Sequence, residues 1–250
     1  MSNHDQQHAP DSLEDRRKAH SELLKQWESH HKQAKHSGDW HFTMDGPSDW
    51  PQYYRQHPRV LFLLKESHGD EWHPSIPCTM DQTRFSENVT LWKYAINMLY
   101  RDPTQQMSFP ALESIHNGDH ADIAFVEAKK LNEGKGTSDD NEIKTYAAKD
   151  KEFLKAQIAL LAPHIVLCAG TIDAYDAIYE EQYDPYVLLS SNGSCKCWRL
   201  SNRLVIEFFH PSYWGKTPQE LYSLLCSPIK TGNVFENFPW SKWCSRPPGS

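Results

Sequence analysis

Four short runs of almost continuously apolar residues stand out along the chain, at residues 59–65, 122–127, 164–169 and 204–209. Helical patterns, in which apolar residues recur every three or four positions, lie between them at about 86–100, 145–162 and 171–181. Strands that are apolar on both faces and alternate with helices are typical of a parallel sheet with helices on both sides. The pattern therefore predicts an α/β fold, a three-layer αβα sandwich around a central, mainly parallel four-stranded sheet.

Residues 1–40 differ from the rest because they are polar and rich in histidine. One helical stretch, DSLEDRRKAHSELLKQWESHHKQAKHSG at 11–38, carries a partial apolar stripe that includes Leu24 and Trp27. We predict an N-terminal arm over 1–40, with its helix packed on the domain or partly frayed, and a single domain over 41–250. The histidines have no tight ligand spacing, which disfavours a metal-binding tract. A last helix is expected at 217–227, with Thr217 as its N-cap.

The charge balance bears on the kind of partner that the protein can bind. The formal net charge of −7 argues against holding nucleic acid by bulk electrostatics. A nucleic-acid enzyme then needs its basic residues gathered on one face, and the candidates are Lys129, Lys130, Lys135, Arg199, Arg203 and Lys216. No apolar stretch approaches a membrane span and the N-terminus has no signal-peptide core, so we expect a cytoplasmic protein with no membrane partner and no obligatory protein partner. The six cysteines are scattered, which argues against a disulfide framework.

Ionisable and small residues follow each of the four predicted strands. Ligands of open α/β sheets bind outside the carboxyl ends of the strands, so these residues are candidates for a reaction site. They are Glu66, Ser67, His68 and Asp70 after the first run, Glu127, Lys129 and Lys130 at the end of the second, Gly170 and Thr171 after the third, and His210, Ser212, Tyr213 and Trp214 after the fourth.

The order of these strand ends resembles the uracil-DNA glycosylase superfamily over roughly residues 58–225. In that family one strand ends in a first motif such as G-E-A-P-G, a second ends in an Asn that reads the flipped base, a third ends in Gly before a helix, and a last runs into H-P-S. The counterparts here are Lys65-Glu66-Ser67-His68-Gly69, IAFVEAKK, PHIVLCAGT and His210-Pro211-Ser212. The resemblance implies a uracil-DNA glycosylase-like fold. It also implies a DNA glycosylase that hydrolyses the N-glycosidic bond of a flipped-out base in DNA containing a modified base, and leaves an abasic site.

The resemblance assigns roles to individual residues as well. Glu66, with Asp70 in reserve, would stabilise positive charge on the sugar and orient water, and His210 would donate a hydrogen bond to O2 of the departing base. Ser67 stands where some branches have a water-activating Asp or Asn. The remaining substrate-binding candidates would line the pocket (His68), approach the phosphate backbone (Lys129, Lys130, Gly170, Thr171 and Ser212) or fill the gap left by the flipped base (Tyr213 and Trp214). The alternatives are a turn-capping role for His210 and core packing for Tyr213 and Trp214.

Glu127 is the largest departure from the family pattern, which has Asn at this position. A carboxamide accepts from N3–H and donates to O4 of uracil, whereas a carboxylate only accepts hydrogen bonds. Glu127 would therefore repel O4 and attract the exocyclic amine of cytosine. We predict a modified cytosine as substrate, since normal cytosine must be spared, in base repair or in defence against viral DNA. The alternative is an ion pair of Glu127 with Lys129 or Lys130 and no contact with substrate.

The G-E-A-P-G branch of the family carries an iron–sulfur cluster on four cysteines, and this chain has no such framework. We expect no metal or other cofactor, and interpret Cys195-x-Cys197 as structural or incidental, with metal binding as the lesser option. Two other functions stay open. One is a catalytically inactive module of the same fold that binds nucleic acid or a nucleotide, which Ser67 and the acidic net charge favour. The other is an enzyme that acts on free nucleosides or nucleotides, for which weak DNA affinity would be the sign.

Overall fold

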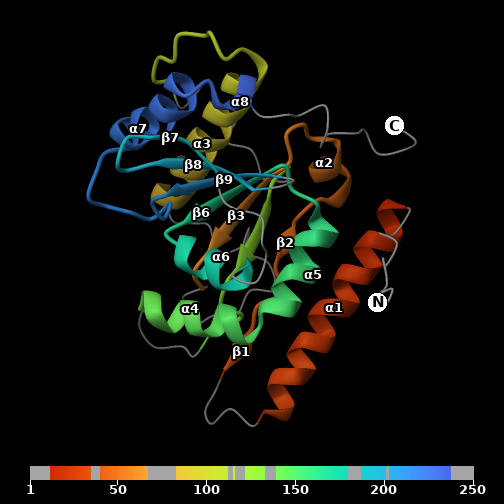
Figure 1. The fold of residues 1–250 in the computed structure, drawn as a ribbon. Coiled ribbons are helices and arrows are strands. Elements are labelled where there is room, and N and C mark those ends of the chain that lie inside the picture. The colour runs from red at the N-terminus through yellow and green to blue at the C-terminus, as the bar shows by residue number, and fades with distance from the viewer. Residues whose placement is uncertain are drawn as a thin grey trace, which may run out of the picture.

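The computed structural model describes residues 12–34, 40–66, 83–111, 115, 122–132, 139–179, 187–200 and 203–237. In this part of the chain a seven-stranded mixed sheet has helices on both faces, so the predicted α/β class is confirmed (Figure 1). The strand order is β2-β4-β3-β6-β9-β8-β7. A separate two-stranded sheet pairs β1 (His41–Phe42) with β5 (Leu131–Asn132).

The four predicted strands form the parallel centre of the large sheet. In spatial order they are β4 (Ala124–Glu127), β3 (Val60–Leu64), β6 (Ile165–Ala169) and β9 (Arg203–Phe208). Each pairs in parallel with its neighbour, so their carboxyl ends lie along one edge of the sheet. Nearly all of their residues are buried, because helices cover both faces.

The predicted four-stranded sheet is wrong, because three antiparallel strands extend the sheet at both sides. β2 (Gly46–Pro47) pairs with β4, while β8 (Lys196–Leu200) and β7 (Val187–Ser191) form a hairpin beside β9. A two-residue strand is too short to show a period of two. The hairpin strands are only partly buried, so their apolar residues are interrupted by polar ones. The sheet is thus larger than the glycosylase-like sheet that the resemblance implies.

Two hydrophobic cores flank the sheet, because successive side chains of each strand point to opposite faces. The core that contains Phe62 and Phe125 is covered by α3 (Thr83–Arg101), α7 (Pro218–Thr231) and α8 (Val234–Asn237). The core that contains Leu61 and Val126 is covered by α1 (Leu13–Gln33), α2 (Trp50–Arg55), α4 (Asp140–Lys149), α5 (Lys151–Leu161) and α6 (Ile172–Tyr179). None of the helices in the described part of the chain has the length and apolar content that a membrane crossing requires.

The single helix predicted over 145–162 is two helices, α4 and α5, which meet at Asp150. The carboxylate of Asp150 is buried, and its Oδ2 lies 2.8 Å from Nε2 of His31 in α1. This partner is distant in sequence, so local periodicity gives no sign of the break. The predicted last helix is confirmed: Thr217 and Glu220 form a capping box at the start of α7.

The N-terminal helix α1 is packed closely on the domain, and its own side chains His20 and Trp27 are buried in the contact. Under the helix, Asp45 pairs with Lys130 Nζ and its Oδ1 accepts a hydrogen bond from Gln157 Nε2 at 2.6 Å. Burial lowers the pKa of His20 to about 4, although the nearby Asp45 carboxylate acts in the opposite direction. α1 therefore closes over buried polar groups as well as apolar ones.

Candidate functional site

The carboxyl ends of the parallel strands stay paired beyond the strands themselves. The Lys129 N–H donates to the Lys65 carbonyl at 3.0 Å, and the Gly170 N–H donates to the Phe208 carbonyl at 2.8 Å. The first bond continues the pairing of β4 with β3, and the second ties the residue after β6 to the end of β9, as the sequence predicts for neighbouring parallel strands.

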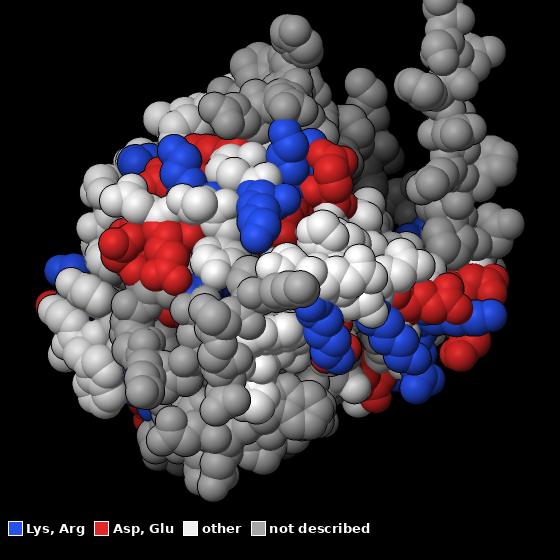
Figure 2. All heavy atoms as spheres, turned by 90° about the horizontal axis from the view of Figure 1, so that it is seen from below, with Lys and Arg blue, Asp and Glu red and all other residues white. Residues whose placement is uncertain are grey.

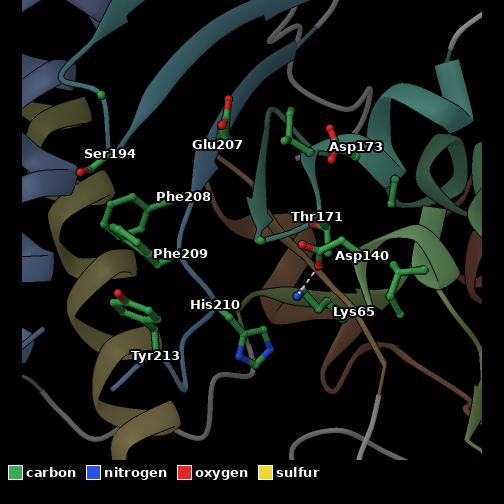
Figure 3. A pocket seen from close by; sticks show the side chains of 15 residues that line it. Lys65, Asp140, Thr171, Asp173, Ser194, Glu207, Phe208, Phe209, His210 and Tyr213 are labelled. Carbon is green, nitrogen blue, oxygen red and sulfur yellow. Dashed lines mark hydrogen bonds and ion pairs between the residues drawn. The ribbon is translucent and has the colours of Figure 1, made fainter. Parts of the chain in front are cut away.

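A cavity of about 470 Å³ opens at this edge of the sheet (Figure 3). Its described walls come from the ends of β3, β6 and β9, the first turns of α4 and α6, and the turn between β7 and β8. Lys65 and Asp140 cross one wall as an ion pair, with Nζ 2.6 Å from Oδ1. Five of the predicted site residues or their neighbours therefore face one space, namely Lys65, Gly170, Thr171, His210 and Tyr213.

Gly170 lies beside two of these side chains, in a backbone conformation that favours glycine. Its φ of +70° lies in the left-handed region, which residues other than glycine rarely adopt. A Cβ at this position would lie 3.4 Å from Lys65 Cε and 3.9 Å from His210 Cβ. The adjacent Thr171 is buried, and its hydroxyl donates to the Leu63 carbonyl at 2.8 Å, so this side chain fixes the start of α6 to β3.

His210 is held by the turn that follows β9. Its Nδ1 accepts a hydrogen bond from the Ser212 N–H at 3.2 Å, which in a neutral imidazole places the proton on Nε2. The buried Asn88 of α3 donates to the Pro211 carbonyl at 2.6 Å and anchors the turn. The imidazole thus both caps a turn and presents a hydrogen-bond donor at the cavity wall.

Glu66 is tied to a buried lysine. Its Oε2 lies 3.1 Å from Lys129 Nζ, and the same ammonium lies 2.6 Å from Glu142 Oε1 and 4.9 Å from the centre of the Tyr146 ring. The side chains of Lys129 and Glu66 are only 2% and 5% exposed. Lys129 therefore positions the Glu66 carboxylate from inside the protein, a role that differs from the phosphate contact predicted for it.

Glu127 and Lys130 lie deeper than predicted. Both are buried at the end of β4, where the Glu127 N–H donates to Asp45 Oδ2 at 2.6 Å. Burial lowers the pKa of Lys130, opposed first by Asp45 and more weakly by Glu127. Because Lys130 is paired with Asp45 beneath α1 and lies 5.1 Å from the Trp27 ring, we no longer place it among the substrate-binding candidates.

The cavity brings together only part of the predicted catalytic set. His210 lines it, whereas neither Glu66 nor Glu127 is among its described lining residues. All three follow or end parallel strands at the same edge of the sheet. The Phe85 ring of α3 lies 5.9 Å from the His210 ring and 6.2 Å from the ring of Phe125, two residues before Glu127. The predicted Ser67, His68 and Asp70 lie outside the described residues.

The two aromatic residues after H-P-S have different surroundings. Tyr213 lines the cavity and stacks on Phe209, with ring centres 4.6 Å apart. Trp214 is 77% exposed, so core packing is the wrong alternative for it. The Arg84 guanidinium lies 5.4 Å from the centre of the Trp214 ring and also donates to the Lys216 carbonyl.

The predicted basic residues do not converge on one face. Lys130 and Arg203 are buried, and Arg203 donates to the Tyr179 hydroxyl at 3.2 Å. Lys135 lies outside the described residues. On the side of the molecule that carries α4, Figure 2 shows acidic and basic side chains intermixed among the described residues. A nucleic acid would find separate positive groups here, not a uniform basic surface.

Four polar residues of the cavity, and the carboxylate that shares Lys129 with Glu66, had not been singled out from the sequence. They are Asp140, Asp173, Ser194, Glu207 and, beside Lys129, Glu142. A signal existed for Ser194, because Asn192-Gly193 between two partly apolar runs is a strong hairpin sequence. The carboxylates gave no such signal, since their position depends on how α4, α6 and β9 pack.

The chain matches no protein-family model, and a search of curated proteins finds no match. The resemblance to the uracil-DNA glycosylase superfamily therefore stays a prediction. Among the described residues, no group of three or more His, Cys, Asp or Glu side chains is arranged to hold a metal ion.

Proposed function

We propose that the chain is a DNA glycosylase that hydrolyses the N-glycosidic bond of a flipped-out modified pyrimidine and leaves an abasic site. The observation that supports this proposal is the presence of two kinds of group at the same edge of the sheet. A buried carboxylate held by an ammonium, Glu66 with Lys129, follows β3, and a donor-bearing imidazole, His210, follows β9 and lines a cavity. Breaking an N-glycosidic bond needs these two kinds of group, because positive charge develops on the sugar and negative charge on the base.

In the proposed reaction, water adds to C1′ of the deoxyribose while the bond from C1′ to the base nitrogen breaks. The bonding electron pair leaves with the base, and the proton lost by the water balances the charge on the departing base. Glu66 stabilises the cationic sugar and orients the water. His210 Nε2–H donates to O2 of the base as negative charge develops there.

The target base must leave the duplex to reach this cavity, which costs a few kcal/mol of unstacking. The turn after His210 offers a compensating contact, because Trp214 is exposed and carries Arg84 over its ring. An aromatic side chain can enter the gap left by the base, while Arg84 and Lys216 approach phosphates. The preference for a cytosine-type base rests on Glu127 standing where the family has Asn, since Glu127 itself is buried and is not among the described lining residues of the cavity. Such an activity would serve base repair or defence against viral DNA with modified cytosines.

A non-catalytic nucleic-acid or nucleotide-binding module is the second candidate. It is favoured by the pairing of Glu66 with Lys129 and of Lys65 with Asp140, because the charged groups of the site are compensated within the chain. An enzyme on free nucleosides is the third, and a DNA affinity that does not fall steeply with salt would favour it.

The deciding experiment incubates the protein with duplexes that contain uracil, cytosine or modified cytosines, followed by alkaline cleavage at abasic sites. The proposal expects strand cleavage for at least one modified pyrimidine, and loss of cleavage in Glu66→Gln and His210→Ala. DNA binding without cleavage of any substrate would refute the glycosylase and support the binding module.

A further inference from the structure

The cavity is longer than a pyrimidine ring needs. Its volume of about 470 Å³ lies within the range of sites that enclose drug-sized ligands. In the view of Figure 3, His210 and Lys65 lie toward one end, while Glu207 and Asp173 lie toward the other. A base placed against His210 would leave the end near Glu207 for a substituent.

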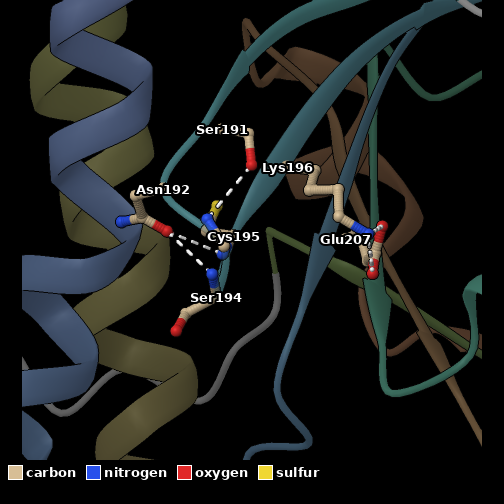
Figure 4. A network of polar contacts seen from close by, with 7 residues as sticks. Ser191, Asn192, Ser194, Cys195, Lys196 and Glu207 are labelled. Atoms are coloured by element: carbon tan, nitrogen blue, oxygen red, sulfur yellow. Dashed lines mark hydrogen bonds and ion pairs between the residues drawn. The ribbon is translucent and has the colours of Figure 1, made fainter.

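The far end is polar, acidic and already neutralised in part. Glu207 receives two hydrogen bonds from Lys196 Nζ, at 2.9 and 3.0 Å (Figure 4). Asp140 also has a lysine partner, because it forms an ion pair with Lys65. Asp173, in the first turn of α6, adds a third carboxylate to the lining. Lys65 and Lys196 thus stand against the three carboxylates of the described lining, which leaves a formal charge of −1. An anionic substituent such as a phosphate would be repelled, because like charges brought together are costly.

An apolar wall leads from these acceptors toward His210, because in the view of Figure 3 Phe209 lies between Glu207 and Tyr213. Phe209 and Tyr213 stack with an interplanar angle of 19° and both line the cavity. Hydroxyl groups donate readily to carboxylates, and the C–H face of a sugar ring packs on an aromatic surface. This combination fits a neutral hydroxylated ring better than a cation, because two of the three carboxylates already have a lysine partner.

The turn between β7 and β8 keeps this end open. Asn192 Oδ1 accepts from the N–H groups of Ser194 and Cys195 at 3.1 and 2.8 Å (Figure 4). Asn192 Nδ2 donates to the Leu224 carbonyl of α7 at 2.9 Å. Gly193, at the tip, has φ +82° and nothing within 4 Å of where a Cβ would stand. The antiparallel hairpin that extends the sheet therefore supplies a fixed wall of small residues and leaves room beside Ser194.

We propose that this end of the cavity binds an uncharged, hydroxyl-rich substituent of sugar size on the target base, through Glu207, Asp173 and Ser194, with the stacked pair of Phe209 and Tyr213 as the wall that leads from this end toward His210. The proposal rests on the proposed glycosylase function, since it identifies the base that the same cavity accepts.

The test compares duplexes that contain cytosine, 5-hydroxymethylcytosine, or 5-hydroxymethylcytosine with a glucosyl, a phosphate or an aminoalkyl group on its hydroxymethyl oxygen. We expect kcat/KM for base release to be at least about 10-fold higher for the glucosylated base, the value of one hydrogen bond to a charged group. Glu207→Gln should lower this value about 10-fold or more, and Ser194→Leu should fill the space and abolish the preference while 5-hydroxymethylcytosine is still released. Glu152→Gln, an exposed acid-to-amide change on α5, is the matched control.

Failure of this inference is separable from failure of the glycosylase. If 5-hydroxymethylcytosine, or the phosphate- or amine-bearing base, is released as fast as the glucosylated base, the inference is overturned and the glycosylase stands. If no base is released, equilibrium binding of the same duplexes decides. If the glucosylated duplex binds more tightly than the others and Ser194→Leu abolishes this difference, the inference about the cavity is supported although the glycosylase is refuted. If all duplexes bind equally, both the inference and the glycosylase are overturned.

Discussion

Replacing Lys129 by methionine tests whether a buried ammonium holds the candidate catalytic carboxylate. Lys129 and Glu66 are 2% and 5% exposed, with Nζ and Oε2 3.1 Å apart, whereas Glu142 on the other side of the ammonium is 40% exposed. Removing the ammonium leaves Glu66 buried without its cation, which costs about 3–5 kcal/mol of folding free energy. Glu142 can turn to water, so Glu142→Gln should cost only about 0.2–1 kcal/mol.

Urea unfolding of five proteins gives these numbers directly: wild type, Lys129→Met, Glu66→Gln, the double variant of these two, and Glu142→Gln. The double variant should be more stable than the sum of the single changes predicts, with a coupling of about 0.5–3 kcal/mol, because the uncompensated charge is gone. Additive effects, or equal losses for Lys129→Met and Glu142→Gln, would refute the positioning of Glu66 by Lys129. In the glycosylase assay, the folded fraction of Lys129→Met should show a lower kcat with KM little changed.

Three other changes probe the backbone, the N-terminal helix and the exposed turn. Gly170→Ala should destabilise the protein by about 1–2 kcal/mol, because φ is +70° there; Gly193→Ala, at φ +82°, should cost about as much, since the new Cβ at Gly170 would make only van der Waals contacts, and an unchanged urea midpoint for either variant would contradict this reasoning. Burial lowers the pKa of His20 to about 4 from 6.5. As the pH falls, the unfolded chain therefore takes up a proton on His20 at a higher pH than the folded protein does, and the free energy of unfolding should fall by about 3 kcal/mol between pH 6.5 and 4. His20→Gln should flatten this part of the pH profile of unfolding, and an unchanged profile would exclude His20 as a cause. Trp214→Ala should leave the free energy of unfolding within about 0.5 kcal/mol of wild type. It should weaken binding to a duplex that contains an abasic site about 10-fold or more, the value of one base stacked on an aromatic ring. Unchanged affinity would show that Trp214 does not contact the DNA.

The centre of the fold could be predicted from the sequence because it depends on local pattern. The run at 59–65 becomes β3 at Val60–Leu64, and Thr217 begins α7 as expected, since continuous apolar residues and helix caps act over a few positions. The edges could not be predicted in this way. β2 has two residues, and the break at Asp150 depends on a buried contact with His31, far away in the chain.

The same distinction, between what local pattern fixes and what distant contacts fix, applies to the candidate site. That Glu66, Lys129, Gly170 and His210 lie at one edge follows from the topology of parallel strands and could be predicted. Which of them face the cavity depends on α4, whose Asp140 and Glu142 engage Lys65 and Lys129. The packing of a helix against strand ends is set by many distant contacts, so a lysine expected to meet phosphate instead supports a carboxylate.

The close packing of α1 sets a limit on how the protein can be shortened. A chain that begins at residue 41 would open the Asp45–Lys130 pair to solvent and uncover Phe153, whose ring stacks on Trp27 with centres 5.3 Å apart. Such a truncation would expose an aromatic surface beside two charged side chains that are buried in the full chain. We expect the truncated protein to aggregate on expression. Affinity tags and fusion partners therefore belong before Ser12, where the described part of α1 is capped.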